Sequence, residues 1–173
     1  MSAPTSNAHT GPDPIDNPAD LVARLEEEQR LLAVARFDNL DAWTLGNILV
    51  DLAVERDLAV TIDVRRPNQI LFHHARPGTT PDNDRWVERK ARTVFHYLES
   101  SWLVRQRFLA RGASFEQDSG LDPALFAAHG GSHPIGVVGA GVVAAVTVSG
   151  LPQHEDHQLV VAGLGAFTAS LDR

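Results

Sequence analysis

The chain has 173 residues, of which 43% are hydrophobic and 21% are charged, and it contains no cysteine. This length and composition predict one globular domain, and the lack of cysteine excludes a disulfide scaffold, a thiolate metal centre and a cysteine nucleophile. The formal net charge of −7 argues against binding to nucleic acid or to an anionic membrane.

The N-terminal segment, residues 1–18, holds four prolines, no lysine or arginine and no long apolar run. It fits neither a secretory signal nor a transit peptide. We therefore expect a disordered tail over 1–18, a single domain over 19–173 and a cytoplasmic protein. The longest uncharged stretch, residues 134–151, contains four glycines and many valines, which suit two buried strands better than a membrane helix.

The first half of the chain predicts two helices and three strands from its apolar periodicity. The helices are expected over about 20–31 and 39–55, and the strands at 32–36, 59–64 and 69–74. The last two strands form a hairpin, because a turn sequence lies between them. Apolar residues recur at helical spacing in the second helix and are expected to face the core: Leu40, Trp43, Ile48, Leu49 and Leu52.

The second half predicts four helices and two strands. Thr80 and Pro81 are typical of the cap and first residue of a helix, which is expected to run to about residue 98. The other helices are expected at 101–111, 122–128 and 152–170, and the strands at 135–138 and 142–148. Because most strands fall in hairpins, this order predicts an α+β fold with about five strands in an antiparallel sheet flanked by helices.

A glycine pattern between the last two expected strands is similar to a dinucleotide-binding fingerprint, with Gly139, Gly141 and Ala144 at the key positions. The residues that follow favour a strand rather than a helix, and only 29 residues remain after Ala144. We therefore interpret the glycines as the turn of a buried hairpin.

Two groups of residues suggest a binding site. Between residues 85 and 111 there are seven basic and two acidic residues, and most of the bases are arginines, which bind carboxylate or phosphate in a bidentate manner. Histidines flank a glycine pair at 129–133 and recur at 154 and 157, and neutral imidazole is a ligand for iron or zinc. The alternatives are that the bases pair with acids elsewhere and that the histidines are structural.

Five blocks of sequence stand out together: RFDN at 36–39, IDVRRP at 62–67, PGTTPDND at 77–84, AHGG at 128–131 and VTVSGLP at 146–152. As a set they resemble the small family described as haem-degrading domain-containing, a branch of the GlcG/HbpS-like haem-binding proteins. The resemblance implies a profilin-like fold with a five-stranded antiparallel sheet and helices on both faces. It also implies dimers or larger rings, and haem or another planar anionic tetrapyrrole as the ligand.

A tetrapyrrole needs an axial donor, a cation for each propionate and an aromatic or apolar wall. The candidates are His129 or His133 as the donor, Trp86 as the wall, and Arg65, Arg66, Arg89 and Lys90 as the cations. A separate hypothesis places iron or zinc between the segment at 129–133 and the start of the last expected helix. The ion would be held by His133, Asp156 and His157 with the help of His129.

The leading functional hypothesis is therefore a cytoplasmic oligomer that binds haem or a related tetrapyrrole, with slow degradation of that ligand as a further expectation. The alternative is a non-enzymatic scaffold in which the arginine and tryptophan residues form an interface between subunits or with another protein. A third class, an enzyme acting on a small carboxylate or phosphate, lacks a visible set of acid, base and nucleophile.

Overall fold

The structure, a computed structural model, describes residues 17–171. The expected tail at 1–18 therefore lies outside the described residues, apart from Asn17 and Pro18, which cap and begin the first helix. The helices of this part are α1 (Pro18–Leu31), α2 (Asn39–Glu55), α3 (Pro81–Tyr97), α4 (Ser101–Ala110), α5 (Phe115–Asp118) and α6 (Gln153–Leu171). The strands are β1 (Thr61–Arg66), β2 (Gln69–Ala75), β3 (Ser132–Val137) and β4 (Gly141–Ser149).

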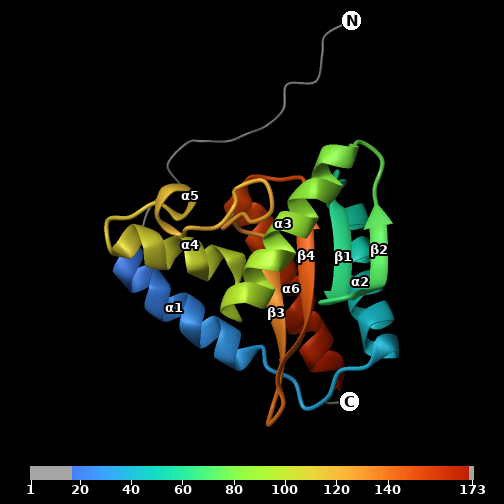
Figure 1. The fold of residues 1–173 in the computed structure, drawn as a ribbon. Helices are drawn as coiled ribbons and strands as arrows, with labels where there is room; N and C mark the ends of the chain where they lie inside the picture. The colour runs from blue at the N-terminus through green and yellow to red at the C-terminus, as the bar shows by residue number, and fades with distance from the viewer. Residues whose placement is uncertain (1–16, 172–173) are drawn as a thin grey trace, which may run out of the picture.

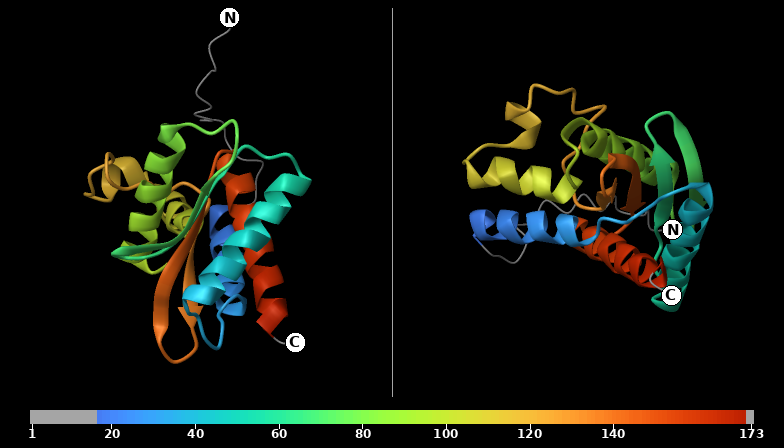
Figure 2. Two further views of the ribbon diagram at one scale, coloured as in Figure 1. Left: turned by 90° about the vertical axis from the view of Figure 1, so that its right-hand side faces the viewer. Right: turned by 90° about the horizontal axis from the view of Figure 1, so that it is seen from below.

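The strands form one antiparallel sheet in the order β2-β1-β4-β3. Helices α2 and α6 pack on one face of the sheet and α3 on the other, while α1 lies along α4 beside β3 (Figures 1 and 2). The main core lies between the sheet and the α2/α6 layer, where Ile62, Val146 and Phe167 are fully buried. The α+β class and the antiparallel sheet predicted from the sequence are thus confirmed.

The sheet has four strands in the described residues, so the predicted fifth strand is wrong. The segment expected at 32–36 makes only one isolated parallel bridge, between Val34 and Val137. Its backbone bonds to β3 run from Val34 N–H to the Gly136 carbonyl and from Val138 N–H to the Val34 carbonyl. The segment follows α1 directly and leads straight into α2, so it lies beside β3 only around Val34.

The short turn of helix predicted at 122–128 forms only in part. Asp122 caps a single turn, accepting bonds from the Leu125 and Phe126 N–H groups through its carbonyl oxygen. The chain then leaves the turn because the Ala127 N–H bonds to the Arg89 carbonyl and the Thr93 hydroxyl of α3. The short helix of this region is instead α5, which buries Phe115 against Phe108.

Within residues 17–171, no helix combines the length and the apolar character needed to cross a membrane. The uncharged stretch at 134–151 forms most of β3 and β4 with the turn between them, as the sequence indicates.

Helix α2 forms where expected, but it is rotated relative to the prediction. Its buried side carries Ala42, Leu45 and Leu49, whereas Leu40 is 76% exposed and Trp43 is 62% exposed. The cap is Asp38, whose carboxylate accepts from the backbone N–H groups of Leu40 and Asp41. The rotation places Gly46 directly on the ring of Phe72 in β2.

Replacing Gly46 by alanine is expected to lower the free energy of unfolding by about 1–3 kcal/mol, because the new Cβ overpacks the core. It would lie 2.3 Å from Phe72 Cγ and 2.5 Å from Cδ1. Gly165 in α6 is the matched control, since a Cβ there meets nothing within 4 Å. Gly165→Ala is expected to raise stability by up to about 1 kcal/mol, as helix propensity alone predicts. Urea denaturation of both variants checks the contrast, and equal effects would contradict it.

Candidate functional site

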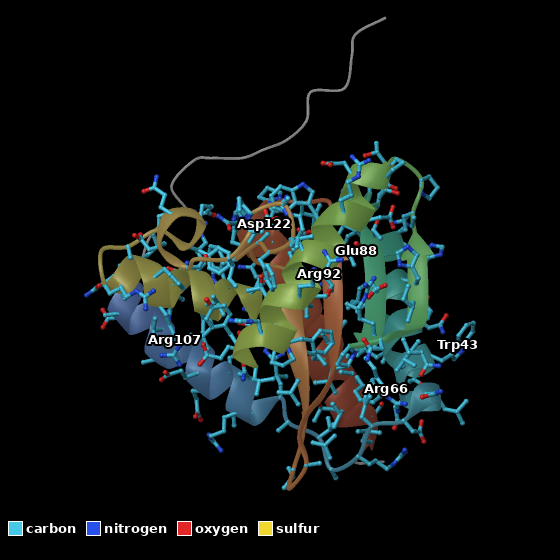
Figure 3. All side chains as sticks on the ribbon, in the orientation of Figure 1. Trp43, Arg66, Glu88, Arg92, Arg107 and Asp122 are labelled. Carbon is cyan, nitrogen blue, oxygen red and sulfur yellow. The ribbon has the colours of Figure 1, made fainter. Side chains whose placement is uncertain are left out.

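The structure does not bring the seven predicted ligand-binding residues together. It divides them among four places: Trp86, Arg89 and His129 at the outer side of α3, Lys90 in a buried ion pair, Arg65 and Arg66 on β1, and His133 inside the core beside α6. Figure 3 shows Arg66 at the lower end of the sheet, well apart from the segment near Asp122 that leads to His129. Only the first place has the features of a ligand site.

Trp86, Arg89 and His129 form a stacked group. The His129 ring meets the Trp86 ring edge-on with 4.9 Å between centroids, and the guanidinium carbon of Arg89 lies 4.3 Å from the centroid of the Trp86 ring. Trp86 and Arg89 are three residues apart on α3 and so share one helix face, while His129 comes from the segment that precedes β3. All three side chains are partly exposed. An aromatic wall, a cation and an imidazole therefore reach the surface side by side.

His129 is held in the neutral form. Burial lowers the pKa of His129 to about 4, and the positive charges of Arg105 and Lys90 act in the same direction. Neither ring nitrogen forms a hydrogen bond with a described residue, and Nδ1 is fully buried without a partner. The Nε of Arg89 is likewise buried and unpaired within the described part of the chain. A neutral imidazole is suited to ligate a metal, and the neighbouring Arg89 and Arg105 are suited to attract an anion.

The structure corrects the role predicted for Lys90. Its side chain is 3% exposed, and its Nζ donates to Asp156 Oδ2 at 2.8 Å and to the Val148 carbonyl at 3.1 Å. Asp156 also accepts the Leu151 N–H at 3.0 Å, and burial raises the pKa of the Asp156 carboxyl against the opposing effect of Lys90. This ion pair joins α3 to the start of α6. It is a structural link, and neither residue is free to bind a propionate or a metal.

The glycine pair at 130–131 has a packing role. A Cβ on Gly130 would lie 2.1 Å from the Gln153 carbonyl oxygen, and one on Gly131 would lie 2.5 Å from the Val148 carbonyl oxygen. Gly131 also has φ +116°, in the region that favours glycine. The pair therefore lets the segment carrying His129 pass between β4 and the start of α6, which is sufficient reason for both glycines.

Arg65 does not project freely from the sheet. Its guanidinium bonds Asp63 in bidentate fashion at 2.5 and 2.8 Å. Asp63 is fully buried and also bonds His73 Nδ1 at 2.9 Å, while His73 Nε2 lies 2.9 Å from Asp84 at the start of α3. This cluster was not predicted from the sequence, although the spacing of Asp63 and Arg65 on one strand places both on the same face.

The predicted shared metal site is not assembled. His133 is fully buried, with Nδ1 2.9 Å from the Pro134 carbonyl oxygen, and its ring centroid is 6.3 Å from that of His157. His157 Nε2 bonds Glu28 of α1 at 2.8 Å, and Asp156 is taken by Lys90. Within residues 17–171 no three histidine or acidic side chains converge to hold a metal ion. The described subunit therefore gives no support to the iron or zinc hypothesis for these residues.

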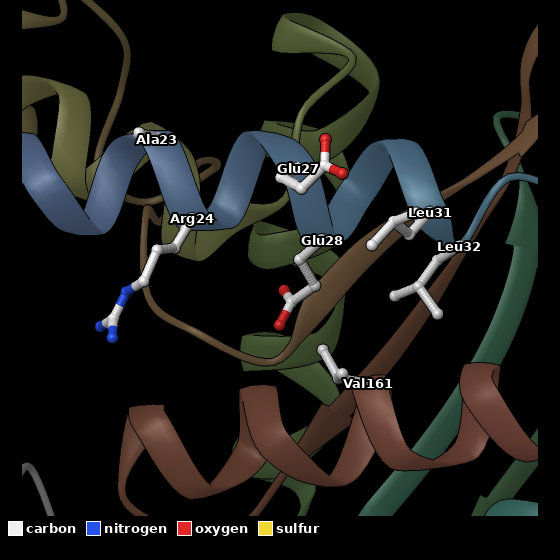
Figure 4. Close-up of a pocket in the computed structure, with 7 residues that line it drawn as sticks. All are labelled: Ala23, Arg24, Glu27, Glu28, Leu31, Leu32 and Val161. Atoms are coloured by element: carbon white, nitrogen blue, oxygen red, sulfur yellow. The ribbon is translucent and has the colours of Figure 1, made fainter.

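A groove between α1 and α6 was not foreseen from the sequence. It has a volume of about 540 Å³ and is lined mainly by apolar side chains with three charged ones, as Figure 4 shows. The lining residues are Ala23, Arg24, Glu27, Glu28, Leu31, Leu32 and Val161. None of them was a predicted site residue, since residues on two separate helices carry no common sequence signal. A second, smaller hollow of about 270 Å³ lies beside α4 and includes Tyr97 and Phe108.

Known proteins match this chain over most of its length. A family model described as "Haem degrading protein HbpS-like" matches residues 37–165. UPF0303 protein SCO2848 of Streptomyces coelicolor is 57% identical over 149 residues, covering 86% of this chain and 94% of that protein. The crystal structure of the Ybr137w protein superposes with a TM-score of 0.80 at 29% identity, over 86% of this chain and 88% of that one. The PduOC:heme complex shares the fold with a TM-score of 0.63 at 15% identity, over 75% of this chain and 94% of that one.

Proposed function

The chain belongs to the HbpS-like family of haem-degrading proteins, and from that premise we propose that it binds haem or a related tetrapyrrole at the Trp86, Arg89 and His129 group. The observation that carries the proposal is the neutral His129 imidazole, which lacks a hydrogen-bond partner in the described chain and stands between an aromatic ring and cations. We further infer that the four-stranded architecture is a variant of the profilin-like fold that the sequence resemblance implies.

The residues present fit such a ligand. His129 would ligate the iron and Trp86 would form the aromatic wall. Arg89 would supply charge for the propionates, with Arg105, which also bonds Glu116 at 3.4 Å, as a second cation nearby. Bound haem would supply iron-centred redox chemistry, and the chain's own contribution is to keep the imidazole neutral. Support also comes from PduOC, a protein of the same fold that was crystallised with heme.

The first test is a titration with hemin, followed through the Soret band. Wild type is expected to give the shifted band of a ligated haem, and His129→Ala is expected to bind at least about tenfold more weakly, because the axial ligand is lost. His96→Ala is the control, since His96 is an exposed histidine on α3, the helix that carries Trp86 and Arg89, and its ring contacts Tyr97 and Phe126. Equal affinity of all three proteins would contradict the assignment of His129.

Slow degradation of bound haem is the second part of the proposal, in line with the family description. Loss of the Soret band and release of iron in the presence of oxygen and ascorbate are then expected, and His129→Ala should slow both. A Soret band that stays constant over hours would restrict the function to binding.

The competing function is a scaffold without small-molecule chemistry, favoured by the exposed Trp43 at the start of α2. No Soret shift in any of the proteins would favour it. Both functions include self-association as a dimer or a larger ring, which we propose because apolar side chains remain exposed on α2 and β2.

A further inference from the structure

The start of α3 is connected to the sheet through His73. This residue lies on β2 opposite Asp63 of β1, and its side chain points to the face of the sheet that α3 crosses (Figures 1 and 2). Its Nδ1 bonds Asp63 Oδ2 at 2.9 Å, and its Nε2 lies 2.9 Å from Oδ1 of Asp84 in the first turn of α3. One imidazole ring therefore joins β1, β2 and α3.

The two carboxylates that face this ring are both placed to carry a negative charge. Asp63 is fully buried and accepts a bidentate bond from Arg65, the contact that an ionised carboxylate makes best. Asp84 is 44% exposed and lies near the start of α3, where the helix dipole favours an acid. Glu88 of α3 is a further negative charge beside Arg65. The proton that the cluster needs is therefore expected on His73.

The contact with Asp84 depends on that proton. A carboxylate only accepts hydrogen bonds, so the ring suits both neighbours only when each of its nitrogens carries a proton. A neutral His73 has one N–H, which Asp63 retains because this fully buried acceptor cannot turn to water. The Nε2 atom would then direct a lone pair at the Asp84 carboxylate, and the two would repel each other. The connection to α3 therefore exists with the charged ring and is lost with the neutral one.

The connected turn leads directly into the candidate site. Trp86 and Arg89 lie two and five residues after Asp84 on α3. Lys90 fixes the following part of the helix through its buried ion pair. Another side-chain contact from the first turn to the sheet is long, since Asn83 donates to a β4 carbonyl at 3.4 Å. Release of Asp84 would therefore let the first turn move and shift the Trp86 ring relative to the imidazole of the site.

We propose that His73, with Asp63 and Asp84, forms a pH-dependent clasp that controls the proposed haem site. With both ring nitrogens protonated, the clasp holds the first turn of α3 against the sheet and keeps Trp86 in position. As the pH rises and Nε2 loses its proton, the clasp opens and the site binds its ligand more weakly. The inference rests on the haem site proposed above for its effect on binding, whereas the clasp itself is a property of the ligand-free chain.

The first measurement follows the clasp in the ligand-free protein. Nitrogen NMR of the His73 ring between about pH 5.5 and pH 8.5 covers the range in which histidine side chains commonly change charge. At the acidic end both ring nitrogens are expected to carry protons. As Nε2 loses its proton, the backbone amide resonances of residues 82–86 should shift with the same midpoint, because the first turn of α3 is released.

The variant Asp84→Asn tests the clasp most directly. An amide side chain can donate to a neutral Nε2 and can accept from a protonated one, so the contact no longer depends on the proton. The amide shifts at 82–86 are therefore expected to become independent of pH. Asp82→Asn is the matched control, since it removes an exposed acid from the same turn and leaves both carboxylates that face His73 in place. This control should titrate like the wild type.

Hemin titrations of the wild type and both variants at pH 6 and pH 8.5 measure the effect on the site. Changes in hemin itself with pH act on all three proteins alike, so the quantity to compare is the affinity relative to Asp84→Asn. For the wild type and Asp82→Asn this ratio is expected to fall about two- to fivefold at the higher pH, as the loss of one partly exposed ion pair predicts.

The outcomes separate the clasp from the haem site. A His73 ring with a proton on Nδ1 alone at pH 5.5, or amides at 82–86 that do not follow the ring, would overturn the clasp whatever hemin does. A clasp that opens as expected while no protein gives a Soret shift would support the clasp and overturn the haem site. A ligated haem whose relative affinity stays constant between pH 6 and pH 8.5 would overturn the control of binding by His73.

Discussion

Replacing Lys90 by methionine is expected to lower the free energy of unfolding by about 3–5 kcal/mol. The change leaves the carboxylate of Asp156, which is 1% exposed, without the ammonium group that now lies 2.8 Å away. It also removes the donor to the Val148 carbonyl. An unpaired buried charge lowers the free energy of unfolding by far more than the ion pair raises it. The reason is that the attraction between two charges buried together largely offsets the free energy lost when both leave water.

The matched control for this prediction is the double variant Lys90→Met/Asp156→Leu. Because it removes both charges and keeps apolar volume, it is expected to recover most of the stability lost in Lys90→Met. Urea unfolding of the wild type and both variants at pH 7 measures the difference. A loss below about 1 kcal/mol in the single variant, smaller than a typical buried-charge effect, would show that the ion pair is unimportant for folding. Hemin binding is not expected to need Lys90, which distinguishes its structural role from the ligand role predicted from the sequence.

Acid is expected to destabilise the protein between about pH 6.5 and pH 4 through His133. Burial lowers the pKa of His133 from 6.5 to about 4, and the charge of nearby His157 acts in the same direction. In this window the unfolded chain binds a proton that the folded chain excludes, so the free energy of unfolding falls as the pH falls. The loss is complete below about pH 4 and is on the order of 3 kcal/mol for a fully buried imidazole.

Urea unfolding at pH 7, 6, 5 and 4.5 tests this dependence. The variant His133→Gln carries no titrating group, so its stability should fall less steeply with acid even if it starts lower at pH 7. His96→Gln, a change at an exposed position of α3, should keep the slope of the wild type. If His133→Gln and wild type lose stability in parallel, His133 is not responsible. His129, whose pKa is also lowered to about 4, contributes in the same direction, but less because its side chain is partly exposed.

The local elements were largely predictable because their signals are local. Thr80 and Pro81 place the start of α3, the turn between β1 and β2 follows from a proline and an asparagine, and the glycines at 139 and 141 mark the turn before β4. The predictions that failed concern segments whose conformation depends on a contact with a distant part of the chain. The 32–36 segment pairs with β3 at only one residue. The turn that begins at Asp122 ends because the Ala127 N–H bonds to the Arg89 carbonyl of α3.

The residues of the candidate site were likewise predictable only in part. The sequence indicates that histidines, arginines and a tryptophan are available, and Trp86 with Arg89 is predictable as a pair on one helix face. It does not show which of the cations are already neutralised. Asp63 and Asp156 are the partners that remove Arg65 and Lys90 from the predicted ligand set. Asp156 is 66 residues from Lys90 along the chain, and no local spacing relates them.

By itself, the sequence determined the α+β class, most helix and strand positions, the family and the types of residue that a tetrapyrrole site requires. These depend on periodicity, capping and turn chemistry, which act over a few residues. The tertiary structure alone decided that His129 rather than His133 is the available imidazole, that Trp43 faces solvent, and that β2 is the open edge. These three features depend on which distant segment covers a side chain and excludes water from it, or forms hydrogen bonds with the backbone of a strand. Such contacts are determined only when the whole chain is packed.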